Sequence, residues 1–159
     1  MLPEINNILY ASDMGKASRP AFSQAVSEAI KHNAKITYLH VMEPMNRSTE
    51  TMIESYLSED VLESLRDKGM DNLKDKMTAR VNLAIQEELA DVDLPEGLID
   101  HHLEAGKPAD VILKVAAEQK ADMIVMGTRT HSSIGKLLMG STAQKVLQAS
   151  GIPVLVVPL

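Results

Sequence analysis

The chain contains no cysteine and no tryptophan, and its 159 residues include one phenylalanine and three tyrosines. Without cysteine there are no disulfides, no thiolate zinc sites and no thiol catalysis, which is compatible with a reducing compartment. The scarcity of aromatic rings also disfavours the base stacking by which proteins hold single-stranded nucleic acids. Hydrophobic residues still make up 45% of the chain, mostly aliphatic side chains and ten methionines. Aliphatic cores of this kind suit helices packed on a parallel sheet.

Positive charge and long apolar runs are also scarce. The formal net charge is −6 and the isoelectric point is about 5.3, which argues against a basic face for DNA or RNA. No apolar run approaches the roughly 20 residues that span a bilayer. The first residues, MLPEINNILYASD, lack the basic and apolar regions of a signal peptide. We therefore expect no nucleic-acid partner, no membrane insertion and a cytoplasmic location.

Short apolar runs alternate with amphipathic stretches along the whole chain. The runs typical of strands are residues 7–12, 35–42, 98–103, 122–126 and 152–157. The stretches with helical periodicity are residues 19–31, 57–89, 108–119 and 140–149. Residues 46–55 show little periodicity and are predicted to be a mobile loop or an irregular helix start. No repeat or change of composition divides residues 1–159, so we expect one domain.

This alternation predicts an α/β fold, a single-domain open parallel five-stranded sheet with helices on both faces. In open sheets of this kind, ligands bind beyond the carboxyl ends of the strands, where the winding direction switches. The rule points to three segments: Ala11 to Asp13 with Ser12 between them, Val41 to Glu43, and the segment that starts at Gly127.

The segment from Gly127 to Ser141 has the composition of an anion site. Gly127 follows a buried strand, and Gly140 and Ser141 open a helix whose unpaired N–H groups and dipole favour negative charge. Thr142 adds a hydroxyl group, and Arg129 and Lys136 add positive charge. The alternative is structural, because Gly-Ser-Thr is also an ordinary helix start and Gly127 an ordinary turn residue.

The histidines, Asp13 and the long acidic helix each allow a functional and a structural interpretation. His101 and His102 are adjacent in a predicted strand, so they point to opposite faces and a half-exposed strand explains them better than a metal site. His131 fits a phosphate contact or a surface loop, and Asp13 fits a ligand contact or a turn cap. The long acidic helix is either a solvated face or a docking face for a partner. No Walker loop, zinc-protease motif or nucleophile elbow occurs.

The chain resembles the universal stress proteins over nearly its whole length. The resemblance is carried by Asp13 after the first strand, His40-Val41, Gly106, MGTRTHSS, KLLMGSTAQKVL and the final IPVLVV. The ATP-binding branch of that family carries a glycine, two residues, a second glycine, nine residues, and then Gly-Ser or Gly-Thr. Gly127, Gly140 and Ser141 match this spacing, and Thr130 replaces the second glycine, so the motif is partly degenerate.

The resemblance implies a role for each matching residue. Asp13 would contact the ribose, Val41 the adenine through its backbone, and Met126 would help to wall the base pocket. The phosphates would be held by Gly127, Gly140, Ser141 and Thr142.

Two positions depart from the pattern of the ATP-binding members. Ala11 stands where they commonly have proline, and Thr130 stands where they have glycine. If that glycine has a positive φ, the β-branched Thr130 costs on the order of 1–2 kcal/mol. Arg129 would offset this cost by pairing with a phosphate.

Three functional hypotheses follow. The first is a regulatory protein that binds ATP, or AMP or ADP, with Mg²⁺, and forms a homodimer through the strand at residues 152–157. It is not expected to be an enzyme, and any ATP hydrolysis is expected to be slow, because no general base or metal cage is evident. The second is an interaction module of the same family that has lost nucleotide binding and regulates a protein partner. The third is an ATP-using enzyme on the same fold, for which no motif was found.

Overall fold

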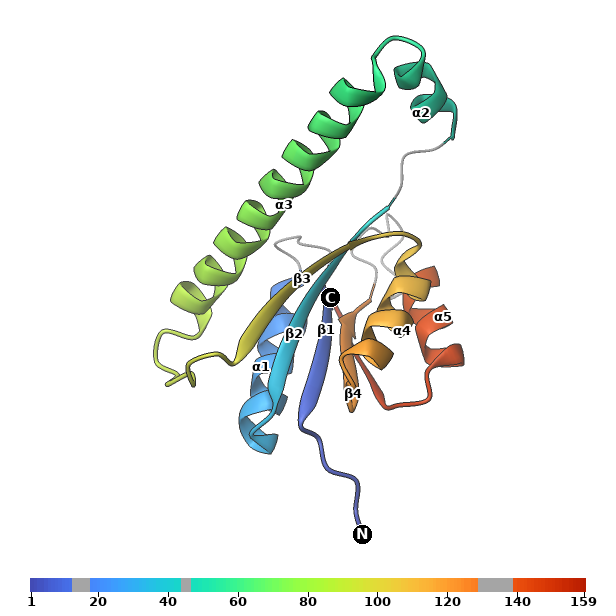
Figure 1. Cartoon of the computed structure of the whole chain (residues 1–159). Helices are drawn as coiled ribbons and strands as arrows, with labels where there is room; N and C mark the ends of the chain where they lie inside the picture. Colours follow the sequence, from blue (N-terminus) through green and yellow to red (C-terminus); the bar gives the residue numbers. More distant parts are fainter. Residues whose placement is uncertain (13–17, 44–46, 129–138) are drawn as a thin grey trace.

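Five parallel strands form one sheet, with β1 at its centre (Figure 1). The computed structural model describes residues 1–12, 18–43, 47–128 and 139–159. The strands are β1 (Asn7–Ser12), β2 (Lys35–Met42), β3 (Ile99–Ala105), β4 (Met123–Gly127) and β5 (Val154–Val157), in the spatial order β3-β2-β1-β4-β5. The helices are α1 (Arg19–His32), α2 (Arg47–Glu54), α3 (Glu59–Glu88), α4 (Pro108–Glu118) and α5 (Ser141–Ala149). The expected fold class is confirmed.

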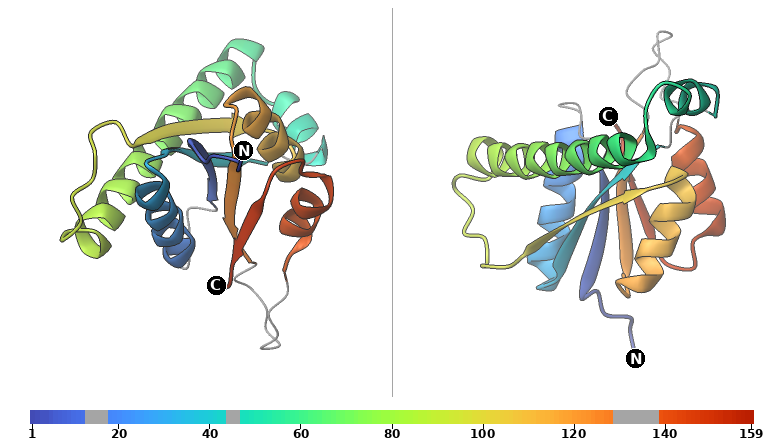
Figure 2. Two further views of the ribbon diagram at one scale, coloured as in Figure 1. Left: turned by 90° about the horizontal axis from the view of Figure 1, so that it is seen from below. Right: turned by 45° about the horizontal axis from the view of Figure 1, so that its top comes forward.

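Two hydrophobic clusters fill the two faces of the sheet. Figure 2 shows α1 and α3 on one side of the sheet and α4 and α5 on the other. The alternation of side chains along each strand decides which cluster a residue joins. Tyr10 and Tyr38 pack with α1 and α3, whereas their neighbours Leu9 and Leu39 pack with α4 and α5. Strands buried on both faces read as continuous apolar runs, which is why β1, β2 and β4 are recognisable in the sequence.

Polar contacts fix the register at the amino ends of the strands. The Asp122 carboxylate accepts hydrogen bonds from the backbone N–H groups of Asn6 and Asn7, at 2.8 Å and 2.9 Å. At the end of α1, Asn33 adopts a left-handed conformation with φ 53° and closes the helix. Arg19 on α1 forms ion pairs with Glu87 and Glu88 at the end of α3. These contacts hold the helices and strands in alignment around β1.

The segment predicted to be a loop or an irregular helix start is an eight-residue helix, α2. Two turns are too short to show a readable apolar period, which is why the pattern was missed. Local contacts support the helix, because the Thr51 hydroxyl donates to the Arg47 carbonyl and Arg66 of α3 lies 3.8 Å from the Glu54 carboxylate. Smaller corrections concern β3, which begins one residue later than predicted and extends to Ala105, and β4, which includes Gly127.

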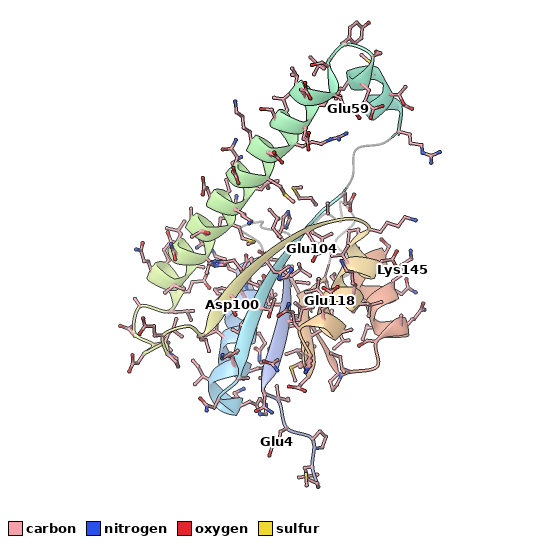
Figure 3. The ribbon with its side chains drawn as sticks, viewed as in Figure 1. Glu4, Glu59, Asp100, Glu104, Glu118 and Lys145 are labelled. Carbon is pink, nitrogen blue, oxygen red and sulfur yellow. The ribbon has the colours of Figure 1, made fainter. Side chains whose placement is uncertain are left out.

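Helices α2 and α3 form an arm that projects past the sheet (Figure 1). A helix of 30 residues is about 45 Å long, and its buried residues, Met77, Val81 and Ala84, all lie in its second half. Figure 3 shows Glu59 at the far end of α3 and side chains projecting from both sides of the arm. The predicted apolar stripe is therefore buried only in part, since Val61 and Leu65 are exposed.

Among the described residues, no helix is both long enough and apolar enough to cross a membrane.

Gly106 makes the turn from β3 into α4, and alanine at this position is expected to destabilise the fold. Its φ is +147°, and an added Cβ would lie 2.7 Å from Cγ2 of Val111. Strain and overpacking together should lower the free energy of unfolding by about 2 kcal/mol, measured by urea denaturation. Gly69, inside α3 with nothing within 4 Å of an added Cβ, is the control. Gly69→Ala should raise stability by about 0.5–1 kcal/mol, and equal effects of the two substitutions would contradict the interpretation.

Candidate functional site

A cavity of about 450 Å³ lies at the carboxyl ends of the central strands. Its volume is within the range of about 300–1,000 Å³ that is usual for small-molecule sites. It occupies the switch point between β1 and β4, where the chain crosses from one half of the sheet to the other. The residues around it come from β1, β2, β4, α4, α5 and the segment after β5: Tyr10, Ala11, Ser12, Ser18, Leu39, His40, Val41, Glu43, Pro108, Ile112, Met126, Gly127, Thr128, Met139, Gly140, Ser141, Thr142, Ala143 and Leu159.

One part of the cavity wall is apolar. Leu39, Ile112 and Met126 are buried members of the cluster beneath α4 and α5, and Val41 packs at its edge. β2, β4 and α4 each contribute to this wall. An apolar wall from three elements can enclose a flat hydrophobic group such as a nucleobase.

A polar network borders the cavity at the end of β1. The hydroxyl oxygens of Ser12 and Tyr38 are 2.8 Å apart, and the Tyr10 hydroxyl donates to the Ser18 carbonyl at 3.2 Å. Nδ1 of His40 is 2.9 Å from the Ser12 carbonyl oxygen. Because a carbonyl only accepts, Nδ1 carries the proton, and Nε2 is left as the acceptor in the neutral ring. The network holds Ser12 and Ser18, the two residues that flank positions 13–17.

The amino end of α5 supplies backbone donors. Gly140 precedes the helix with φ 84° and ψ 153°, a conformation almost restricted to glycine. The first intrahelical bond of α5 joins the N–H of Gln144 to the carbonyl of Gly140. The N–H groups of Ser141, Thr142 and Ala143 therefore have no partner within the helix, and the helix dipole adds partial positive charge at the same place. This end of the cavity favours an anion.

The β4 end of the cavity is joined to the segment after β5. The Thr128 N–H donates to the Val157 carbonyl at 3.0 Å, and the Leu159 N–H donates to Oγ1 of Thr128 at 3.0 Å. The Leu159 side chain lies directly on Gly127, where an added Cβ would be 2.3 Å from its Cδ1. The Leu159 side chain thus occupies the space that a side chain at position 127 would need.

An ionic contact joins β3 to α4, which carries part of the apolar wall. Lys114 of α4 donates to Glu104 of β3 at 3.1 Å, and His102 Nε2 lies 3.1 Å from the same carboxylate. Figure 3 shows Glu104 on the strand and Glu118 on the helix beside it. The hydrogen bond from Lys114, followed by that from His102, lowers the pKa of Glu104, and the contact with Glu104 raises the pKa of Lys114. The pair therefore stays charged at neutral pH.

The match to a family model decides the classification of the chain. Residues 4–158 match the model described as the universal stress protein family. The chain belongs to the universal stress protein family. A universal stress protein from Thermus aquaticus is 33% identical over 150 residues, covering 94% of this chain and 96% of that relative.

Solved universal stress proteins have the same fold. UspA from Lactobacillus plantarum superposes with a TM-score of 0.69 at 24% identity, covering 98% of this chain and 99% of the other. A universal stress protein in complex with cAMP has a TM-score of 0.65 at 21% identity, covering 98% of each chain. The protein from Archaeoglobus fulgidus in complex with dAMP has a TM-score of 0.58 at 18% identity, again covering 98% of each chain.

Most site residues expected from the sequence lie around this one cavity: Ala11, Ser12, Val41, Met126, Gly127, Gly140, Ser141 and Thr142. Asp13, Arg129 and Thr130 lie outside the described residues, as do His131 and Lys136. In the part of the chain that the structure describes, no group of three His, Asp or Glu side chains could hold a metal ion. His101 is exposed and His102 is half-buried on β3, which forms an edge of the sheet.

Sequence reasoning missed several cavity residues of this universal stress protein. Ile112 and Pro108 come from α4, and Leu159 follows β5, so their place depends on packing between distant elements. His40 and Thr128 could have been predicted from the sequence, because each is adjacent to a predicted site residue at a strand end.

The hydroxyl pair of Ser12 and Tyr38 should stabilise the end of β1 measurably. Tyr38→Phe removes one partner of a buried hydrogen bond, so the free energy of unfolding should fall by about 1 kcal/mol in denaturant titrations. Ser12→Ala is the matched variant. In the double variant the two losses should not add, with a coupling of about 0.5–1.5 kcal/mol; strict additivity would show that the pair contributes nothing jointly.

Proposed function

We propose that this universal stress protein is a regulatory protein that binds an adenine nucleotide, with ATP as the leading ligand. The observation that carries the proposal is the composition of the cavity, whose lining combines an apolar wall with the amino end of a helix. A nucleotide has matching chemistry, a flat base joined to an anionic phosphate group. The solved relatives in complex with cAMP and dAMP, both adenine nucleotides, support this choice.

The arrangement of the cavity suggests how the ligand would lie. The base would rest between Val41, Ile112 and Met126, and the phosphates would accept hydrogen bonds from the N–H groups of Ser141 and Thr142. Ala11 and Ser12, at the end of β1, also line the cavity and would face the ribose. The contacts expected of Asp13, Arg129 and Thr130 stay predictions.

Magnesium would accompany the phosphates of ATP rather than occupy a site of its own. The described residues offer no cluster of carboxylates or imidazoles for it, and Mg²⁺ commonly binds through nucleotide phosphates and water. Rapid phosphoryl transfer needs a positioned nucleophile and strong charge stabilisation. We propose binding with at most slow hydrolysis, in the cytoplasm, and a signalling role that follows from occupancy.

We further propose that the protein forms a homodimer through β5. Among the described strands, β5 has one neighbour, β4, and its other edge is unpaired. All four residues of β5 are hydrophobic and half-buried, and an apolar edge strand favours pairing with a second chain.

A second candidate function is regulation of a protein partner without nucleotide. It is favoured by the exposed hydrophobic residues of the arm, Met52, Tyr56, Leu57, Val61 and Leu65. Apolar side chains grouped on one projecting element are a common mark of an interaction site. The two functions are compatible in one protein. A measurement of nucleotide binding distinguishes the first function from a protein that has the second function only.

A charge placed at the amino end of α5 should distinguish ATP from adenosine. Ser141→Glu is expected to weaken ATP binding by about tenfold or more, because the new carboxylate repels the phosphates. Adenosine affinity should change less than about twofold, and the helix should stay folded because acidic residues suit its first turn. Isothermal titration calorimetry with both ligands measures the difference.

Gln144→Glu is the matched control, because Gln144 is exposed on the same helix and does not line the cavity. It adds the same charge and should alter ATP affinity little. No bound adenine nucleotide after acid extraction, together with no thermal shift at millimolar ATP, would reject the nucleotide proposal and favour the interaction module.

Proline in β5 should separate self-association from folding. The carbonyls of Pro153 and Val157 face β4, so the alternation of the strand turns the N–H groups of Val154 and Val156 outward. Val156→Pro removes an outward donor and should shift the protein toward monomer in sedimentation equilibrium. The backbone N–H of Leu155 faces β4, so Leu155→Pro should instead destabilise the fold by about 3 kcal/mol. A Val156→Pro variant that stays dimeric would contradict pairing through this edge.

A further inference from the structure

The Leu159 side chain packs closely against Gly127. An added Cβ on Gly127 would lie 2.3 Å, 2.8 Å and 3.2 Å from three carbons of the Leu159 side chain. A real Cβ atom essentially never lies within 3.0 Å of such carbons, so a larger residue at position 127 would force the Leu159 side chain to shift. Leu159 is half-buried and packs at the edge of the cluster beneath α1 and α3.

The same residue is also tied to the backbone of β4. Its N–H donates to Oγ1 of Thr128, while the Thr128 N–H donates to the Val157 carbonyl. Thr128 is therefore bonded through its amide to the last residue of β5 and through its hydroxyl to Leu159. At Thr128 the chain leaves β4 on its way to Gly140 and the amino end of α5.

We propose that Leu159 is a positioning residue for the phosphate end of the cavity. Its side chain holds Gly127 from one face of the sheet, and its amide holds Thr128. Together they fix the point from which the chain runs to the helix that receives the phosphates. Leu159, Gly127 and Thr128 thus form a clamp at the end of β4. Leu159 packs with the cluster beneath α1 and α3, whereas Val41 and Ile112, two of the residues proposed to hold the base, belong to the cluster beneath α4 and α5. This inference rests on the proposed nucleotide function and adds to it a residue outside the expected glycine motif.

The clamp makes a specific prediction for ligand selectivity. Leu159→Ala should weaken ATP binding about fivefold to tenfold and change adenosine binding less than about twofold, because Leu159 supports Gly127 and Thr128 but packs in a different cluster from Val41 and Ile112. Leu159→Met, which keeps an apolar side chain of similar volume, should retain most of the ATP affinity. Ile152→Ala is the control: Ile152 is a half-buried aliphatic residue near β5 that does not line the cavity, so its loss should leave the ATP-to-adenosine ratio unchanged.

A double substitution tests the contact itself. Gly127→Ala should displace the Leu159 side chain and weaken ATP binding, because the added methyl group occupies its space. The Leu159 side-chain carbons that the added methyl group would contact are absent in Leu159→Ala. The double variant should therefore bind ATP no more weakly than the single variant with the lower ATP affinity. Additive losses in the double variant would overturn the clamp, since independent sites add.

Hydrogen exchange in the absence of nucleotide provides a readout that does not depend on binding. The Thr128 amide should lose protection in Leu159→Ala and keep it in Ile152→Ala. If wild-type protein binds ATP and the Leu159 variants keep its affinity and its amide protection, the positioning role is wrong and the proposed function stands. If wild-type protein binds no adenine nucleotide, the proposed function and this role fail together.

Discussion

The pairing of β1 with both β2 and β4 is the constraint on which the site depends. These two contacts place β1 in the centre of the sheet, and the chain must cross from one half to the other between β3 and β4, through α4. The connections on the two sides then diverge at the carboxyl ends of β1 and β4, which leaves a cavity that no single element encloses. The apolar wall, the polar network and the amino end of α5 meet there because the strand order brings them together, although they come from opposite halves of the sequence.

The few aromatic rings of the chain are concentrated where they support this cavity. Tyr10, Phe22 and Tyr38 form one cluster with ring centroids 5.0–5.5 Å apart. Edge and tilted contacts of this kind stabilise a core beyond simple burial. The hydroxyl groups of the two tyrosines reach the sheet end, where they contact Ser12 and the Ser18 carbonyl. A rigid aromatic core therefore holds both residues that flank the segment containing Asp13.

The rest of the molecule divides into a well-packed body and a projecting arm. Arg19 and Ser23 of α1 contact Glu88 at the base of α3, and buried residues of α3 stop at Met77. Beyond this point the arm presents hydrophobic residues without a core to cover them. The cavity and the arm are thus separate surfaces, and a regulatory protein can use one to bind a ligand and the other to contact a partner. The clamp at Leu159 joins the cavity instead to β5, the strand proposed for self-association.

The amino-acid sequence by itself determined the class of fold and most of its elements. Strands β1, β2 and β4 are buried on both faces, so continuous apolar runs mark them, and α1 and α4 carry clear periodic stripes. The sequence also placed eight cavity residues, because strand ends and a Gly-Ser helix start are local features. Helix α2 escaped detection because two turns give no period, and the exposed half of α3 looked buried because periodicity does not reveal what lies opposite a helix. Only the tertiary structure decided that Ile112 and Leu159 belong to the cavity and that Leu159 covers Gly127. Such contacts join residues far apart in the chain, and their existence depends on strand order and packing, which no local pattern encodes.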